Sequence, residues 1–366
     1  MKFTVKTKEL ASGINTVIKA IPSRGTMQIL ECVLVKAESD SLELTGNDMN
    51  LGIRTIINAD VEEMGTVAIE AKMLNDIISK VPADTINIAV NESDYSVSIK
   101  SGRAKFNIGG IDPSSFTDMP EVNVSKFIEI EQSQLRTLVQ GTIFAAATDG
   151  NKMMSGELFW LKDGELKTVA LDGHRVAIRK IKVDSDDEWK VVVPGKAIQD
   201  ISKLLAKDDG RKIKIGTTRN HIVFKFDDTY ITSLLIDGEY FDINRMMTED
   251  YNSLVTVDKS EIMDVLGRSF LFTREANKKP VIMDIHGDSI GISIESTMGK
   301  MNDEISAEVE GEEVMIGFNP YFLMDAIKTI ESDYVRMYIL SAKSPCFIRD
   351  EESNYCYVVL PVFFAK

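Results

Sequence analysis

A threefold internal repeat is the feature that most constrains how this chain folds. Three segments align without gaps, at offsets of 125 and 127 residues: FTVKTKELASGINTVIKA from Phe3, IEIEQSQLRTLVQGTIFA from Ile128 and VTVDKSEIMDVLGRSFLF from Val255. Each pattern predicts a short alternating strand that leads, after a polar break, into an amphipathic helix with apolar side chains at i, i+4 and i+8. One structural plan therefore occurs three times.

A second strand–helix unit recurs inside each copy. It reads VAIEAKMLNDII from Val67, VVVPGKAIQDIS from Val191 and IGFNPYFLMDAI from Ile316. Alternating or β-branched stretches bounded by turn residues follow every helix, which is typical of strands. We therefore predict an α+β protein of three similar domains, each with two helices packed on antiparallel sheets. The predicted domains are 1–124, 125–250 and 251–366.

The placement of charge decides whether an anionic partner is possible, because the net charge is −15 and phosphate binding needs cations. The expected outer faces of two helices are basic, with Lys72 on one and Lys196 and Lys203 on the other. Acidic runs such as 184–188 and 308–313 fall in strand-connecting loops. Helices gathered on one side of a sheet would then hold a polyanion through sequence-independent phosphate contacts. The alternative is an acidic scaffold that binds only proteins, because each lysine alone fits an ordinary solvated surface.

The turn in TVALDGHRVAIRK, residues 168–180, places Asp172 and His174 together. A catalytic role would need a nucleophile from elsewhere, and the sequence contains no G-x-S-x-G or P-loop motif. The corresponding stretch of the first repeat, residues 44–53, has an Asp but no His. We therefore favour a docking surface and predict no catalytic residue, no metal site and no cofactor. An enzyme that uses this pair stays open as the alternative.

The C-terminal sequence YVVLPVFFAK is apolar almost to its last residue. Chain ends usually fray, so this tail is either packed into the core or forms one wall of a pocket. No apolar run approaches the roughly 18 residues that a membrane helix needs, and the N-terminal MKFTVKTKEL lacks a signal-peptide core. We therefore expect a cytoplasmic protein without a membrane partner.

Five stretches together resemble the β sliding clamp family, the processivity ring of bacterial replicative DNA polymerase. They are TVALDGHRVAI, SGRAKFNIGGIDPSSF, LTGNDMNL, IGFNPYFLMDAI and the ending YVVLPV, and the resemblance covers essentially the whole chain. It implies the DNA clamp fold, a head-to-tail homodimeric ring and no catalytic activity. The implied partners are duplex DNA of any sequence, a second copy of the chain, the replicative polymerase (DNA polymerase III), a clamp loader, and repair proteins that carry short motifs rich in Gln and Leu.

The resemblance also implies three sets of functional residues by position. The implied partner-peptide groove consists of Met154, Leu171, Gly173, His174, Arg175, Val176, Phe241, Arg245, Met246, Asn319, Phe322, Val358, Val359, Leu360, Pro361 and Val362. The implied DNA contacts are Arg24, Lys72, Arg103, Lys152, Lys196 and Lys203, and the implied dimer interface sets Phe106 and Ile108 against Leu271 and Phe272. The chain departs from the family pattern at Phe241, where relatives often have proline, and in its ending with Phe363 and Phe364.

Overall fold

The strand–helix repeat folds as the sequence predicts, and each copy adds a 3-10 turn at the helix end. The computed structural model describes residues 1–22, 27–273 and 279–364. The first unit of each copy is β1 (Lys2–Lys6) with α1 (Thr7–Val17), β10 (Ile128–Glu131) with α3 (Gln132–Thr142), and β18 (Ser253–Asp258) with α5 (Lys259–Ser269). The 3-10 turns are η1 (Ile18–Ala20), η4 (Ile143–Ala145) and η6 (Phe270–Phe272).

The second strand–helix unit also recurs three times. Its members are β6 (Gly65–Glu70) with α2 (Ala71–Ile78), β14 (Trp189–Pro194) with α4 (Gly195–Leu204), and β23 (Val314–Phe318) with α6 (Pro320–Thr329). Polar side chains start several of these helices by accepting backbone N–H groups that have no partner inside the helix. Asp258 accepts from the backbone of Ser260 and Glu261 at 2.8 and 3.0 Å. Asn319 caps α6, where Pro320 occupies the first turn.

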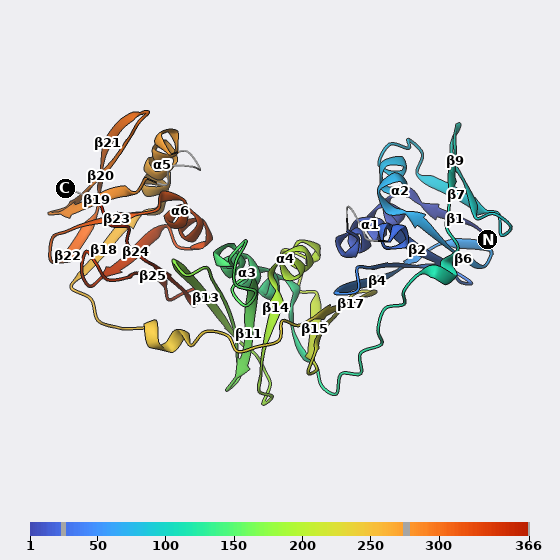
Figure 1. The fold of residues 1–366 in the computed structure, drawn as a ribbon, viewed down its shortest axis with the longest axis horizontal. Helices are drawn as coiled ribbons and strands as arrows, with labels where there is room; N and C mark the ends of the chain where they lie inside the picture. The colour runs from blue at the N-terminus through green and yellow to red at the C-terminus, as the bar shows by residue number, and fades with distance from the viewer. Residues whose placement is uncertain (23–26, 274–278, 365–366) are drawn as a thin grey trace. The chain divides into compact units, whose positions relative to one another are not determined.

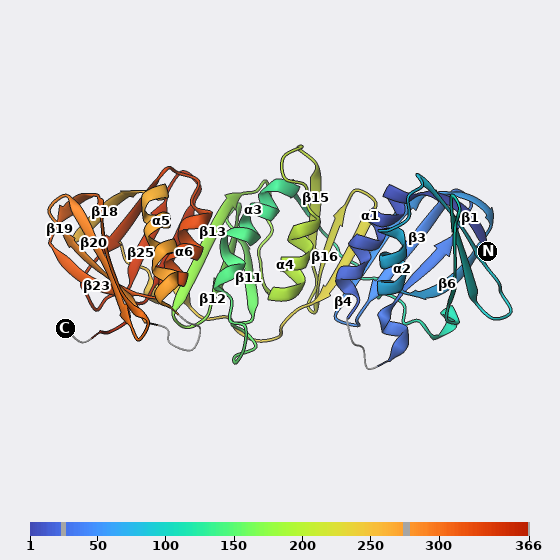
Figure 2. The same cartoon turned by 90° about the horizontal axis from the view of Figure 1, so that it is seen from above.

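One compact unit comprises Met1–Leu135 and Lys196–Leu235, and it contains two antiparallel sheets. Sheet A has the order β5 (Asp60–Glu63), β1, β7 (Thr85–Val90), β8 (Ser96–Ser101), β9 (Ala104–Gly109). Sheet B has the order β10, β15 (Lys212–Thr217), β16 (His221–Phe226), β17 (Thr229–Leu234), β4 (Leu51–Asn58), β3 (Ser41–Asn47), β2 (Cys32–Ala37), β6. Helices α1 and α2 pack side by side (Figure 1, Figure 2). Leu10, Ile14 and Val17 of α1 are buried, and α1 contacts β3 and β4.

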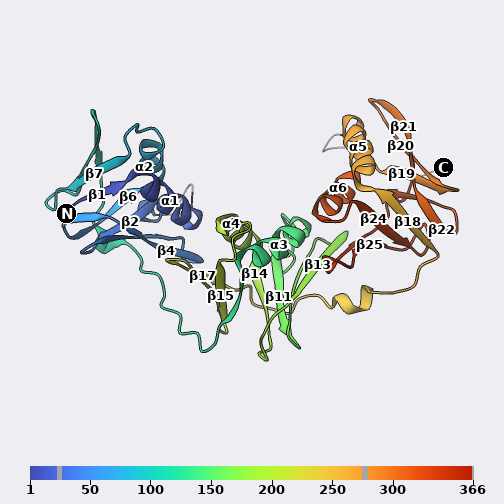
Figure 3. The same ribbon diagram turned by 180° about the vertical axis from the view of Figure 1, so that it is seen from behind.

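The other compact unit comprises Arg136–Gly195 and Ile236–Lys366 and also contains two antiparallel sheets. Sheet C has the order β14, β11 (Gly156–Lys162), β12 (Glu165–Leu171), β13 (Arg175–Lys182), β26 (Tyr355–Val359), β25 (Cys346–Asp350), β24 (Tyr334–Ile339), β18, β22 (Glu308–Gly311). Sheet D has the order β21 (Gly299–Ser306), β20 (Ser289–Ser296), β19 (Val281–His286), β23. Helices α5 and α6 pack together beside these sheets (Figure 3).

Strand pairing joins successive repeats within sheets B and C. Strand β17 pairs with β4, with Ile231 opposite Ile53, and β13 pairs with β26, with Val176 opposite Val358. The predicted α+β class with antiparallel sheets is confirmed. The division at residues 124 and 250 stays a prediction, because strands from neighbouring repeats share a sheet. Among the described residues, no helix is long and apolar enough to cross a membrane.

Candidate functional site

The turn between β12 and β13 is an Asp-centred turn held by its own backbone. Oδ1 of Asp172 accepts hydrogen bonds from the backbone N–H groups of His174 and Arg175, at 3.0 and 3.2 Å. Gly173 has φ 88°, a left-handed conformation that glycine adopts without the strain of a Cβ. An Asp followed by Gly is the chemistry that such a turn favours. The sequence D-G-H-R therefore encodes a defined loop shape.

The Arg175 side chain is fixed at several points. Its Nε donates to Asp172 Oδ2 at 2.9 Å, its Nη1 to Asp325 Oδ2 on α6 at 2.8 Å, and its Nη2 to the Phe144 carbonyl at 2.7 Å. The guanidinium also lies over the Phe322 ring, 4.2 Å from the centroid. Planar guanidinium groups suit such combined carboxylate and aromatic contacts. Arg175 thus ties the turn to α6 and to η4.

This geometry gives Asp172 and His174 no catalytic arrangement. The carboxylate oxygens of Asp172 bind backbone N–H groups and Arg175, and a catalytic pair would need the carboxylate to orient the imidazole. The His174 ring instead stacks on Phe322, with centroids 6.3 Å apart. Among the described residues, no group of three or more His, Cys, Asp or Glu side chains is placed to hold a metal ion.

The C-terminal strand brings the end of the chain beside this turn. Arg175 lies opposite Val359 in the β13–β26 register. Past the strand, the Leu360 N–H donates to the His174 carbonyl at 2.9 Å, and the Val362 N–H donates to the Gly317 carbonyl of β23 at 2.8 Å. The segment Leu360–Val362 therefore leads from the turn, where Leu360 is bonded, to β23, where Val362 is bonded.

A small apolar cluster underlies the turn and the tail. Leu171, Val176 and Val358 are at most 4% exposed and pack in one cluster, with Met154 against its margin. Two residues that the sequence did not single out, Tyr240 and Ile243, complete the cluster from the segment that follows sheet B. The Tyr240 hydroxyl donates to the Val169 carbonyl at 3.2 Å. Burial raises the pKa of this phenol above its ordinary value, so it stays a neutral donor.

Other predicted groove residues differ in how they are held. Phe241 and Met246 are exposed, at 39% and 41%, and Phe241 packs edge-on against Tyr240. Arg245 is almost fully exposed and pairs with Asp242 at 3.2 Å. The Asn319 side chain caps α6 by accepting the Tyr321 N–H at 3.0 Å. The structure therefore brings three groups of residues together. They are a buried floor (Leu171, Val176 and Val358), a tail wall (Leu360–Val362) and exposed rim side chains (His174, Phe241, Arg245 and Met246). The full set of groove residues stays a prediction.

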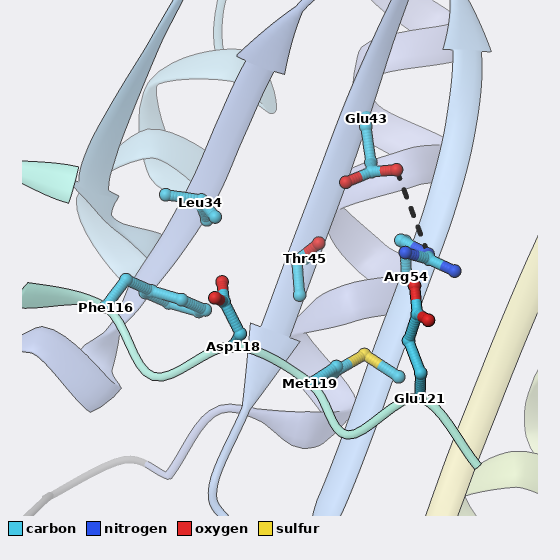
Figure 4. Close-up of a pocket in the computed structure, with 8 residues that line it drawn as sticks. All are labelled: Leu34, Glu43, Thr45, Arg54, Phe116, Asp118, Met119 and Glu121. Carbon is cyan, nitrogen blue, oxygen red and sulfur yellow. Dashed lines mark ion pairs between the residues drawn. The ribbon is translucent and has the colours of Figure 1, made fainter. Parts of the chain in front are cut away.

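The first repeat contains the same turn without the apolar cluster. Asp48 accepts from the backbone of Asn50 and Leu51 at 2.9 and 2.7 Å, and the Leu234 N–H donates to the Asn50 carbonyl at 2.8 Å. Beside it lies a polar cavity of about 300 Å³ (Figure 4). The cavity is lined by Leu34, Glu43, Thr45, Arg54, Phe116, Asp118, Met119 and Glu121. Thr45 and Arg54 stand where the second repeat has Val169 and Ile178 of its apolar cluster, and Arg54 pairs with Glu43 at 3.8 Å. These polar side chains make the wall of this cavity polar.

The predicted DNA-contact residues are separate exposed cations wherever the structure describes them. Lys72 lies on α2, Lys196 and Lys203 lie on α4, and Arg103 lies in the turn between β8 and β9. Lys203 also pairs with Asp200 at 2.9 Å. Lys152 lies in the turn before β11 in the other compact unit. Arg24 falls outside the described residues.

Two of the predicted dimer residues lie on the edge strand of a sheet, and the other two lie on a 3-10 turn next to another edge strand. Phe106 and Ile108 are half-buried on β9, the edge strand of sheet A. Leu271 and Phe272 lie on the 3-10 turn η6, where Leu271 is 69% exposed. Phe272 faces Gly299 at the start of β21, the edge strand of sheet D. The sequence predicted Leu271 and Phe272 and gave no sign that β21 lies beside them, because its polar alternation has no marker of an edge.

Comparisons with known proteins agree along the whole chain. Family models of the N-terminal, central and C-terminal domains of the DNA polymerase III beta subunit match residues 1–120, 129–242 and 244–363. The beta sliding clamp of Bacillus subtilis (strain 168) is 30% identical over 377 residues, covering 99% of each chain. A solved structure titled a putative DNA polymerase III beta subunit, from Eubacterium rectale, is 40% identical with a TM-score of 0.93 over 100% of both chains. The solved sliding clamp from Bacillus subtilis has a TM-score of 0.93 at 30% identity, again over 100% of both chains.

The threefold repeat of strand–helix units on antiparallel sheets, matched in full by solved clamp structures, defines a DNA clamp, a class of protein without catalytic activity of its own. The three domain models account for nearly every residue. The chain belongs to the DNA polymerase III beta subunit family, the β sliding clamps. It is a non-catalytic subunit that confers processivity on that polymerase. The family, the fold class and the function predicted from the sequence are confirmed.

Proposed function

We propose that partner proteins dock a short apolar peptide in the groove between the Asp172–Arg175 turn and the Leu360–Val362 tail. The observation that carries this proposal is the hydrogen bond from the Leu360 N–H to the His174 carbonyl, 2.9 Å, which sets the tail wall beside the turn. The buried floor of Leu171, Val176 and Val358 suits apolar side chains. Apolar slots with a few oriented polar groups are the usual form of such sites.

The rim of this groove suits a motif rich in Gln and Leu. The leucine side chains would pack on the partly exposed margin of this apolar cluster at Met154. A glutamine amide would bond to the exposed His174 ring or the exposed Arg245 guanidinium. Because the floor is small, the affinity should be modest, so that polymerase, clamp loader and repair proteins exchange on one clamp. His174 orients the peptide in this proposal and moves no proton.

The free sheet edges support a head-to-tail homodimer. Sheets B and C contain eight and nine strands, whereas sheets A and D contain five and four and end at β9 and β21. Apolar Phe106 on β9 and Leu271 beside β21 are exposed or half-buried. An edge that carries apolar side chains is an aggregation hazard unless another strand covers it. Pairing β9 of one copy with β21 of the next would cover both edges and, repeated once, close a ring.

Duplex DNA inside that ring would be held by enclosure, with weak phosphate contacts from the exposed cations Lys72, Lys196 and Lys203. Weak contacts are required for sliding, because many strong phosphate contacts would make retention steeply dependent on salt. We also propose that this activity takes place in the cytoplasm. A scaffold that never meets DNA is the outcome that the following test would reveal.

The ring is tested by topology. The clamp is loaded with a clamp loader and ATP onto nicked circular duplex DNA, and its retention is followed after the circle is cut once. We expect stable retention on circles and rapid loss from linear ends. Equal retention on both forms would show binding by affinity without enclosure and would overturn the ring.

The groove is tested by fluorescence anisotropy with a labelled Gln/Leu-rich peptide. His174→Ala should weaken binding about tenfold or more, because it removes the ring that stacks on Phe322 at the rim. His286→Ala, an exposed histidine on β19, is the matched control and should leave the affinity unchanged. Equal affinities for the two variants would argue against docking at the turn.

A further inference from the structure

The last residues of the described chain do not fold back over the groove. The Val362 N–H donates to the Gly317 carbonyl at 2.8 Å, and the Phe364 ring lies against Gly317 on sheet D. Phe363, between them, is 76% exposed. The two phenylalanines that distinguish this ending therefore have different environments. One is seated on a sheet and the other faces solvent.

The seat of Phe364 is a recess on one face of sheet D. Phe364 lines a cavity of about 560 Å³ together with Ile282, Ile292, Met315 and polar side chains such as Asp284. In the strand register, Ile282 lies opposite Gly317, and Asp284 lies opposite Met315. Gly317 has no side chain, so a gap opens in the row beside Ile282. An aromatic ring is the size of group that such a gap admits, and its burial removes apolar surface from water.

Glycine at 317 is required by the close approach of the tail. A Cβ placed there would lie 2.7 Å from the Val362 carbonyl oxygen and 2.8 Å from Phe364 Cδ1. Both distances are shorter than carbon makes without displacement, and the first involves backbone. Glycine is the residue that permits such an approach. Gly317 and Phe364 therefore form one contact that holds both ends of the segment 362–364.

We propose that Phe364 is a positioning residue for the partner-peptide groove: its ring, seated on Gly317 in the recess lined by Ile282 and Met315, holds Val362 on β23 and so keeps the tail wall, through Leu360, beside the Asp172–Arg175 turn. This inference rests on the proposed docking function. A segment that follows the last strand of a sheet is ordered only where contacts hold it, and Leu360–Val362 follows β26. Removing the ring leaves the Val362 hydrogen bond to Gly317 as a backbone tie of this segment to β23.

The expected effect follows from the fraction of molecules whose wall is in place. A ligand that needs a competent conformation binds with an affinity reduced by the population of that conformation. If the Phe364→Ala wall is in place roughly one tenth of the time, the peptide dissociation constant rises about tenfold. Phe364→Leu, which refills the recess with apolar volume, should restore most of the affinity. Phe363→Ala is the matched control, one residue away and exposed.

Two measurements keep the anchor and the groove distinguishable. In the anisotropy assay, wild type, Phe363→Ala and Phe364→Leu should bind the peptide with similar affinity. Phe364→Ala and Gly317→Ala should bind it more weakly. Amide hydrogen exchange at Val362, measured without peptide, should accelerate in Phe364→Ala and Gly317→Ala and stay slow in Phe363→Ala. The unfolding midpoint of the compact unit should be the same in all three phenylalanine variants, which separates positioning from general stability.

Each outcome decides the inference. Fast Val362 exchange together with weak peptide binding in Phe364→Ala supports it. Wild-type affinity in Phe364→Ala, or an equal loss in Phe363→Ala, overturns it. Slow exchange at Val362 in Phe364→Ala also overturns it, because the ring is then not the anchor. A wild-type protein that binds no peptide, with fast exchange in Phe364→Ala, overturns the proposed groove and leaves the tail anchor standing.

Discussion

Replacing Arg175 with alanine should destabilise the compact unit that contains residues 136–195 and 236–366. The guanidinium is 10% exposed and bonds to Asp172, Asp325 and the Phe144 carbonyl. Its loss removes three hydrogen bonds and a contact with the Phe322 ring. It also leaves the Asp172 carboxylate, 15% exposed, without its cation.

The magnitude follows from those contacts. A hydrogen bond to a charged group contributes about 1.5 to 3 kcal/mol, and breaking a buried pair costs about 3 to 5 kcal/mol. Asp325 is 39% exposed, so water screens that pair and its share must be reduced. Asp172 keeps its two backbone donors. We therefore expect a loss of about 3 kcal/mol in the free energy of unfolding.

The chain provides its own probe for this measurement. It contains two tryptophans, Trp160 on β11 and Trp189 on β14, and both lie in the unit that holds Arg175. Urea unfolding followed by tryptophan fluorescence therefore reports that unit. Arg175→Lys should recover little of the loss, because an ammonium cannot make the same set of planar contacts.

Arg245→Ala is the matched control, because that side chain is 86% exposed. It should leave the unfolding midpoint where it is in the wild type. A loss of less than about 1 kcal/mol in Arg175→Ala, with the same fluorescence change on unfolding, would refute the view that Arg175 ties the turn to α6.

Three further predictions concern charge and edges. Burial raises the pKa of the Glu157 carboxyl well above 4.5, so above pH 4.5 the folded state keeps a proton that the unfolded state releases. The free energy of unfolding therefore falls as pH rises above that value, by about 1.4 kcal/mol per pH unit, until the folded pKa is reached. Glu157→Gln should resist urea better than wild type at pH 8 and equally near pH 4.5, and a pH-independent difference would contradict this. Lys196→Glu combined with Lys203→Glu should lower the salt dependence of DNA binding by about two in log–log slope, and an unchanged slope would mean that neither lysine meets a phosphate. Phe106→Asp on β9 should give monomers in sedimentation equilibrium, whereas an intact dimer would exclude β9 from the interface.

The local elements follow directly from the sequence because their causes are local. Each of the two strand–helix units occurs three times in the structure, at the spacing that the sequence predicts. The Asp-Gly pair likewise predicts the turn at 172–173 that the structure contains. The 3-10 turns such as Phe270–Phe272 escaped prediction, because apolar side chains continue past the last α-helical turn. The second strand–helix unit has an aspartate at one shared position, Asp76, Asp200 and Asp325. Nothing in the local sequence indicates that Arg175 is the partner of Asp325.

The candidate site was located from the sequence by family resemblance and by the turn itself, while its support came only from the structure. Tyr240 and Ile243 are ordinary apolar residues in a segment without regular pattern, and their packing on Leu158 and Val176 depends on where that segment crosses the sheet. The contrast with the first repeat is of the same kind. Thr45 and Arg54 look like routine strand residues, and their consequence, a polar cavity, appears only once the strands pair.

The sequence by itself determined the repeated strand–helix plan, the Asp-centred turn and the apolar ending, because periodicity, turn chemistry and composition act over a few residues. Only the tertiary structure decided that β26 pairs with β13, so that Leu360 meets His174 and Phe364 meets Gly317. Several strands in this chain have similar alternation, and every one exposes the same backbone donors and acceptors. Which edges meet is set by the packing of all helices and sheets together, and no short stretch of residues carries that information.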